Sequence, residues 1–284
     1  AESRAHPRAQ GQVQNDVRHL VTPRGMTRRE IAQMRRDHVD AALRSRRAGF
    51  DLISYYAGVA ALPAFFLYPF YNRRTDEYGG SFENRLRFLR ELLEETREAI
   101  DDCAIGLRFS IDTLEAPFGL GDRGIRAAEE GADIVRALDP LVDFWDVNIG
   151  TINWGEDAGP SRFFATNHEE AYTRHAKAAA TKPVVNVGRF TDPDVMARAI
   201  TSGQCDLIGA ARPSIADPFL PAKIEAGRYD EIRECIGCNV CISRWEVGAV
   251  PIWCTQNPTA GEEYRRGWHP ERLPRARNAG DDVL

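Results

Sequence analysis

Short apolar runs alternate with amphipathic helical segments along most of this chain, and this alternation constrains the fold more than any other feature. The apolar runs predict five strands, at 50–56, 104–110, 144–150, 183–189 and 205–212. The helical patterns lie at 27–49, from Ser81 for about twenty residues, near 125–138, at 167–180 and at 191–203. Strands that are almost entirely apolar are buried on both faces, which is typical of parallel sheets covered by helices. The pattern therefore predicts an α/β protein.

The first predicted helix has a clear start. Thr27 is followed three residues later by Glu30, which is the spacing of a capping box. An apolar face then continues up to Gly49, through Ile31, Met34, Val39, Ala42 and Leu43.

Two α/β architectures compete, a doubly wound sheet and a (β/α)8 barrel. The Gly-x-Gly-x-x-Gly fingerprint of dinucleotide-binding sheets does not follow the first strand. Instead the last two strands end in Gly188-Arg189 and in Gly209, Ala210, Ala211 and Arg212, where barrels bind phosphate. This favours a partial TIM (β/α)8 barrel of about five βα units. Because five strands cannot close a barrel, and residues 1–26 are too short and polar to supply three more, we expect the first three strands to be missing.

Four of the six cysteines fall within twenty residues. Cys235, Cys238 and Cys241 are spaced at intervals of three, and Cys254 follows after twelve intervening residues. Zinc usually takes two separated Cys-x-x-Cys pairs, whereas a compact run of three with a distant fourth suits a [4Fe–4S] cluster. Zinc, disulfides and buried thiols are the alternatives. Cys103 and Cys205 begin apolar runs and are expected to be small buried hydrophobic residues.

Composition and charge exclude several classes of partner. The net charge of −5 and pI near 5.8 provide no field for nucleic acid or an anionic membrane surface. The sequence has no signal peptide and no apolar run of membrane-spanning length. We therefore expect a cytoplasmic protein, where reduced thiols suit a thiolate-ligated cluster.

Three regions are predicted along the chain. Residues 1–232 form the partial barrel, 233–268 the cluster-binding segment, and 269–284 a linker. The missing initiator Met and the polar, Pro- and Gly-containing end suggest a piece of a longer protein.

Several motifs together resemble the iron–sulfur flavoenzymes of the old yellow enzyme class, and within it the trimethylamine dehydrogenase-like group. The resemblance covers nearly the whole chain. It is carried by 71–85 (YNRRTDEYGGSFENR), 154–162 (WGEDAGPSR), 211–218 (ARPSIADP) and 235–268. The first motif is common to the wider class, and the second and the last are much narrower.

The resemblance implies that the barrel at 1–232 binds an FMN cofactor beside the cluster, and that the linker at 269–284 leads to a nucleotide-binding domain that this chain lacks. An arginine within an apolar strand, Arg108, needs a fixed acceptor, and the matching arginine faces the flavin ring in the similar enzymes. We therefore assign Arg108 to stabilising reduced FMN, with a structural salt bridge as the alternative. The FMN phosphate is expected at Gly188, Arg189, Gly209, Ala211 and Arg212.

The resemblance also suggests a substrate site. Trp154 and Trp245 match tryptophans that enclose an alkylammonium group, although a lone Trp more often belongs to a core. Tyr56 and Asp157 match two members of a Tyr, His and Asp acid–base set, and Val59 stands where the histidine is expected. Small residues at 57–61 predict a roomier apolar pocket and a larger N-alkyl amine.

Three functional hypotheses follow. The leading one is FMN- and [4Fe–4S]-dependent dehydrogenation or N-demethylation of an amine, with electrons leaving through the cluster to an electron-transferring flavoprotein or similar one-electron acceptor. The second is an NAD(P)H-dependent enoate or 2,4-dienoyl-CoA-type reductase. The third is a non-catalytic remnant that binds no FMN. A homo-oligomer, specifically a dimer, is also expected.

Overall fold

The computed structural model describes residues 24–58, 61–114, 124–150, 159–246, 250–272 and 280, and the side chains of Trp245 and Glu246 lie outside this description. Predictions that fall on 1–23, including the expected N-terminal loop, on 59–60 and on 151–158 therefore lie outside the described residues.

Five parallel strands form one sheet, in the order in which they occur along the chain. They are β1 (Leu52–Ala57), β2 (Ala104–Asp112), β3 (Phe144–Ile149), β4 (Val184–Asn186) and β5 (Leu207–Ile208). A doubly wound sheet reverses its strand order near the middle, whereas a barrel adds each strand beside the previous one. The predicted partial barrel of about five βα units is thus confirmed, with the last two strands shorter than the sequence predicted.

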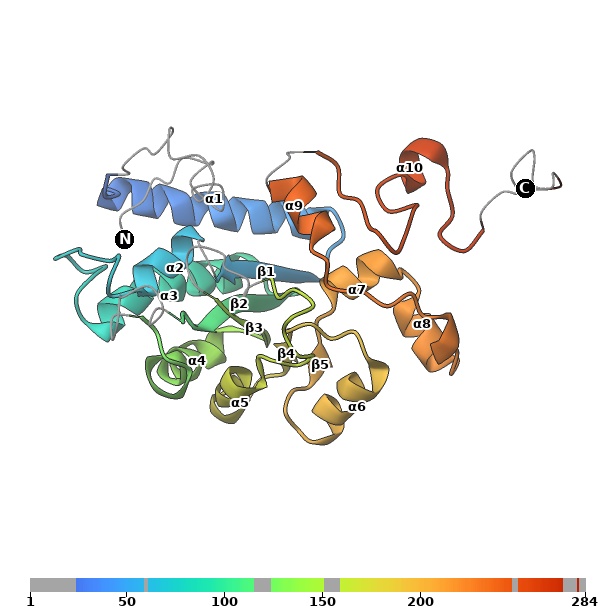
Figure 1. Cartoon of the computed structure of the whole chain (residues 1–284). Coiled ribbons are helices and arrows are strands. Elements are labelled where there is room, and N and C mark those ends of the chain that lie inside the picture. The colour runs from blue at the N-terminus through green and yellow to red at the C-terminus, as the bar shows by residue number, and fades with distance from the viewer. Residues whose placement is uncertain are drawn as a thin grey trace.

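Helices lie between successive strands, as a barrel requires. The longer ones are α3 (Phe82–Ala99), α4 (Ala132–Leu138), α5 (Glu170–Ala179) and α6 (Pro193–Thr201), and a further long helix, α1 (Arg28–Arg47), precedes β1. Figure 1 shows α4, α5 and α6 one after another along one side of the sheet. A π-helical turn (Ala127–Gly131) precedes α4, and a 3-10 turn (Asp139–Leu141) follows it.

The two faces of the sheet differ sharply in burial. On the helix-covered face, Leu107, Trp145 and Val184 have no exposed surface. On the other face, neighbouring strands align a row of residues, namely Tyr56, Arg108, Asp146, Val185 and Leu207. Tyr56 is 39 % exposed and Leu207 is 51 % exposed. This open face, rather than the helix-covered one, carries the predicted site residues.

The predicted helix starts agree with the structure. Thr27 and Glu30 form the expected capping box before α1, and the Ser81 side chain accepts a hydrogen bond from the Asn84 N–H before α3. Sequence analysis missed α2 (Leu62–Leu67), which lies between the first predicted strand and the helix predicted from Ser81. This short helix has Pro63 in its first turn and is mostly buried, so it lacks the amphipathic period that identifies longer helices.

Four short helices follow the sheet. They are α7 (Ala211–Ala216), α8 (Leu220–Glu225), α9 (Val240–Glu246) and α10 (Glu263–Arg266), with a 3-10 turn at Tyr229–Glu231. Figure 1 places them beyond the end of the strand series.

A buried ion network holds the segment after α10 against α8. Lys223 Nζ donates to Asp217 Oδ2 at 2.7 Å and to Glu271 Oε1 at 3.0 Å. The His269 ring stacks on Phe219, with ring centroids 5.6 Å apart. The part of the predicted linker at 269–272 is thereby packed against the end of the barrel.

No helix among the described residues is both long enough and apolar enough to cross a membrane.

Candidate functional site

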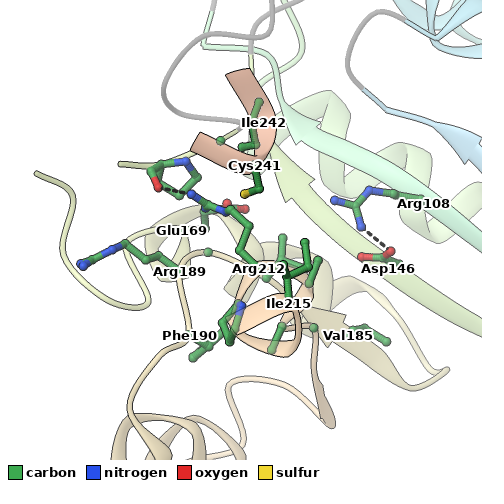
Figure 2. Close-up of a pocket in the computed structure, with 18 of the residues that line it drawn as sticks. Arg108, Asp146, Glu169, Val185, Arg189, Phe190, Arg212, Ile215, Cys241 and Ile242 are labelled. Atoms are coloured by element: carbon green, nitrogen blue, oxygen red, sulfur yellow. Dashed lines mark hydrogen bonds and ion pairs between the residues drawn. The ribbon is translucent and has the colours of Figure 1, made fainter. Parts of the chain in front are cut away.

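A cavity of about 380 Å³ lies at the ends of β4 and β5 and extends over the open face of β2 and β3. All six residues predicted to bind the cofactor line it, which are Arg108, Gly188, Arg189, Gly209, Ala211 and Arg212. In Figure 2, Arg108 lies at the right of the view and Arg189 at the left, with Arg212 and Ile215 between them. Residues that are 104 positions apart in the sequence therefore meet at one site.

Arg108 is paired with a carboxylate from the neighbouring strand. Its Nη1 donates to Asp146 Oδ2 at 2.6 Å, and the two residues are register partners between β2 and β3 (Figure 2). The guanidinium carbon also lies 5.9 Å from the centre of the Tyr56 ring. The salt bridge considered as an alternative is present, and Arg108 still lines the cavity.

Tyr56 lies on the same row of the sheet as Arg108. Desolvation raises the pKa of its hydroxyl, and the positive charge of Arg108 offsets part of that rise. Tyr56 is therefore a protonated phenol at neutral pH.

Two glycines at the strand ends are required by close packing. Gly188 has a φ of +121°, and a side chain there would meet the Glu169 side chain at 2.9 Å. At Gly209 a side chain would lie 2.6 Å from Val187 Cγ1. Packing alone explains both glycines, and it also exposes the backbone of these turns to the cavity.

Arg212 forms the wall between this cavity and the cysteine segment. Its Nη1 donates to the Pro160 carbonyl oxygen at 2.6 Å and to Asn239 Oδ1. Burial lowers the pKa of its guanidinium, and the Cys235 and Cys241 thiols act in the opposite direction. A buried cation of this kind is stabilised by any anion that enters the cavity.

Arg189 lies on the other side of the cavity. Its Nη1 donates to the Phe164 carbonyl oxygen at 2.7 Å, and its Nε is buried without a hydrogen-bond partner among the described residues. The backbone φ of +56° turns the chain sharply at this residue. A buried unpartnered N–H is a donor for which an anion or a water molecule supplies an acceptor.

The four clustered cysteines line a second, smaller pocket. Cys235, Cys238, Cys241 and Cys254 enclose it together with Arg212. No three Cys, His, Asp or Glu side chains in the described part are grouped tightly enough to hold a single metal ion. No disulfide joins these thiols.

The two remaining cysteines agree with their prediction. Cys103 is 3 % exposed and Cys205 is 2 % exposed, and each lies within a hydrophobic cluster. Burial raises the pKa of both thiols, so they are inert small hydrophobic residues.

Several predicted substrate-site residues lie outside the described residues. These are Val59, Trp154, Asp157 and the side chain of Trp245, whose backbone lies on α9. Of the small residues expected to enlarge the pocket, Ala57 is fully buried on the helix-covered face of β1. It therefore contributes to the core and not to the cavity.

Sequence analysis missed three residues that the fold brings to the site. Asp146 pairs with Arg108, the 2 % exposed Glu169 accepts a hydrogen bond from the Ile149 N–H, and Asn239 binds Arg212. Asp146 carried a detectable signal, because it is a carboxylate inside an apolar strand next to the strand of Arg108. Asn239 and Glu169 lie in loops, and no sequence pattern marked them as site residues.

Known proteins resemble this chain over most of its length. Residues 1–231 match the model of the NADH:flavin oxidoreductase / NADH oxidase family. The chain is 55 % identical over 257 residues to dimethylamine dehydrogenase of Hyphomicrobium sp., which covers 90 % of this chain and 34 % of that protein.

Two solved structures are also similar. The amine oxidase acting on 6-hydroxypseudooxynicotine from Pseudomonas geniculata N1 has a TM-score of 0.84 and 48 % identity, over 92 % of this chain and 38 % of its own. Histamine dehydrogenase from Rhizobium sp. 4-9 has a TM-score of 0.82 and 47 % identity, over 89 % and 36 % respectively. The chain thus spans little more than a third of the length of these relatives.

Proposed function

The chain belongs to the NADH:flavin oxidoreductase / NADH oxidase family, and on that premise we propose that it supports FMN- and [4Fe–4S]-dependent oxidation of an N-alkylated amine to an aldehyde and a smaller amine. The observation that carries the proposal is a shared wall. Arg212, Ile215 and Cys241 line both the large cavity and the cysteine pocket. A flavin in the first and a cluster in the second would be close neighbours, as electron transfer between them requires.

The cavity chemistry fits FMN. The backbone at Gly188 and Gly209 is accessible, the buried Arg189 Nε lacks an acceptor among the described residues, and Arg212 is a desolvated cation. These groups would bind the phosphate, and Val185 and Ile215 provide apolar surface for the ring system. Arg108 would lie beside the edge of the flavin that becomes negatively charged on reduction.

FMN held by Arg108, Arg189 and Arg212 would supply an acceptor for a hydride equivalent from the carbon next to the amine nitrogen, and a cluster held by the four cysteines would supply one-electron transfer. Water would hydrolyse the resulting iminium to the aldehyde and the smaller amine. Tyr56 and Asp157 would hold and move the proton of the substrate nitrogen. The indole faces of Trp154 and Trp245 would attract an alkylammonium group, at about 0.5–2 kcal/mol each.

The similar proteins agree with an amine as the substrate. They include a dimethylamine dehydrogenase, a histamine dehydrogenase and an amine oxidase. We extend this chemistry to the present chain as a proposal, together with a one-electron acceptor such as an electron-transferring flavoprotein and a homodimeric assembly. The division into a barrel at 1–232, a cluster segment at 233–268 and a linker at 269–284 belongs to the same proposal.

Anaerobic mixing with candidate electron donors tests the proposal. The FMN-loaded protein would be mixed with a panel of secondary and tertiary amines while the flavin absorbance is followed. Bleaching by an amine, with release of an aldehyde, is the expected result. Bleaching by NADH or NADPH but by no amine would instead identify a reductase. Failure of the protein to bind FMN at all would leave the non-catalytic alternative.

A further inference from the structure

The cysteine loop is held on the cofactor cavity by one amide side chain. Asn239 lies between Cys238 and Cys241, and its Oδ1 accepts a hydrogen bond from Arg212 Nη1. Its Nδ2 donates to the Gly159 carbonyl oxygen at 2.7 Å. An amide can accept from a cation with its oxygen and donate to a carbonyl with its nitrogen, whereas a carboxylate cannot donate and an alkyl group can do neither.

The backbone of Asn239 is suited to this position. Its φ is +56°, a left-handed conformation that asparagine adopts more readily than most other residues with a side chain. The turn directs the amide towards residues 159–160 and Arg212, away from the direction of the following helix α9.

A second contact holds the same cysteine loop in place. The Gly237 carbonyl oxygen accepts a hydrogen bond from the Arg162 N–H at 3.0 Å. An added side chain at Gly237 would lie 2.8 Å from that nitrogen and 3.0 Å from Arg189 Nε. The cysteine loop therefore packs directly on the segment and on the arginine that border the cofactor cavity.

Arg212 lies between the two pockets and lines both of them. Among the described residues its hydrogen bonds all use Nη1, and their acceptors are Pro160 and Asn239. The loop thus fixes one edge of the guanidinium, and the cavity lies along the same side chain (Figure 2). An arginine whose orientation is fixed in advance loses less conformational entropy when it binds an anion.

We infer that Asn239 is a positioning residue that orients Arg212 for the cofactor phosphate, so that FMN affinity and the order of the cysteine loop are linked. The inference rests on the proposed function. Linkage is reciprocal, so a cluster that orders the loop tightens FMN binding, and bound FMN stabilises the loop.

A double-mutant cycle in the purified protein tests this inference. FMN dissociation constants would be measured by fluorescence titration for wild type, Asn239→Gly, Arg212→Lys and the double variant. Glycine tolerates the left-handed backbone, so Asn239→Gly removes the amide without adding strain. We expect it to weaken FMN binding about tenfold, the loss typical of one charge-assisted hydrogen bond. In the Arg212→Lys background the same change should alter the dissociation constant less than twofold.

Two further measurements separate positioning from a general structural effect. Arg244→Ala removes a hydrogen bond to Pro251 within the same segment, and it should leave FMN affinity within twofold of wild type. Removal of iron should weaken FMN binding in wild type and have little effect in Asn239→Gly. Should Asn239→Gly fail to assemble a cluster, Asn239→Gln keeps the amide, and we expect it to restore the cluster and part of the FMN affinity.

The outcomes are distinct. Equal effects of Asn239→Gly in both backgrounds, or an unchanged dissociation constant, would overturn the inference and leave the proposed function intact. A wild-type protein that binds no FMN would overturn the proposed function and the inference with it.

Discussion

Arg108 and Asp146 are register partners on adjacent strands, and their side chains form a 2.6 Å ion pair on the open face of the sheet. The pair lies on the row that begins with Tyr56 and lines the candidate cofactor cavity. One oxygen of Asp146 accepts from Arg108, and the other is buried without a hydrogen-bond partner in the described part of the chain. The carboxylate therefore balances the charge that Arg108 would present to a flavin.

Removing the negative charge of Asp146 should raise the reduction potential of bound FMN. Asp146→Asn keeps the shape and an oxygen acceptor but removes the negative charge, so Arg108 stabilises a reduced, anionic flavin more strongly. The reduced flavin is stabilised by about 1 kcal/mol more, which corresponds to on the order of 40 mV for one electron. A spectroelectrochemical titration measures it, with the exposed Asp133→Asn as the control for a change in net charge. An unchanged or lower potential would contradict this role.

Several features of the fold depend on neighbouring residues or on the order of the elements, and these could be predicted from the sequence. The caps at Thr27 and Ser81 were predictable because each depends on residues within three positions. The strand order followed from the alternation of strands and helices, since parallel neighbours need a crossover between them. In that topology, Arg108 and the strand-end glycines Gly188 and Gly209 line one cavity.

The remaining features depend on geometry that a single sequence does not encode locally. The Arg108–Asp146 pair requires the register of β2 against β3, and a shift by one residue would separate it. The Arg212–Asn239 contact joins the first turn of α7 to an irregular loop 27 positions further along the chain. The helix α2 is mostly buried, so it has no polar face to reveal its period.

The buried pair of Lys223 and Asp217 should matter more for stability than an exposed pair of equal length. The side chains are 2 % and 0 % exposed, and Lys223 Nζ lies 2.7 Å from Asp217 Oδ2. Lys223→Met leaves a buried carboxylate without its cation and should lower the free energy of unfolding by about 3–5 kcal/mol. Lys177→Met breaks a pair that also measures 2.7 Å but is 32 % and 37 % exposed, and should cost about 0–1 kcal/mol. Urea unfolding measures both, and equal losses would refute the distinction.

The same pair predicts a pH dependence. Burial alone would raise the pKa of Asp217, but the hydrogen bonds from Lys223 and the Arg233 N–H hold it below its ordinary value. Burial would likewise lower the pKa of Lys223, and its two carboxylate partners raise it instead. A depressed acid loses its contribution as pH falls through the folded pKa, and a raised base loses its contribution as pH rises through the folded pKa. The pair therefore stabilises the fold fully between about pH 4 and pH 10.

Unfolding of wild type and Asp217→Asn across pH measures this dependence. The difference in unfolding free energy between them should be constant from about pH 5 to 9. It should narrow below about pH 4, where the carboxyl of the unfolded wild-type chain becomes protonated, and disappear once the pH falls below the lowered pKa of Asp217 in the folded protein. A difference that persists unchanged at the lowest pH at which both proteins fold would show that the charge of Asp217 is not what stabilises the fold.

Gly237 should tolerate no side chain, unlike a glycine of similar conformation elsewhere. Gly237 and Gly227 have φ values of +65° and +68°, but an added side chain at Gly227 meets nothing within 4 Å. Gly227→Ala should therefore cost only the left-handed backbone penalty, about 1–2 kcal/mol. Gly237→Ala adds a clash with the Arg162 backbone, so it should also displace the cysteine loop and lower the iron content. Iron analysis and urea unfolding of both variants measure the difference, and retention of full iron content by Gly237→Ala would contradict it.

Cys241 lines both pockets, so its loss should separate the two halves of the proposed reaction. In Cys241→Ser the groups around Arg108 remain, and an amine should still bleach the flavin in anaerobic stopped-flow mixing. Electrons should then stay on the flavin, because a three-cysteine site would no longer hold an intact four-iron cluster and transfer to a one-electron acceptor would stop. Cys103→Ala, in the hydrophobic core, should retain both steps. Full turnover with the one-electron acceptor in Cys241→Ser would exclude the cluster as the outlet, since flavin reduction alone cannot account for it.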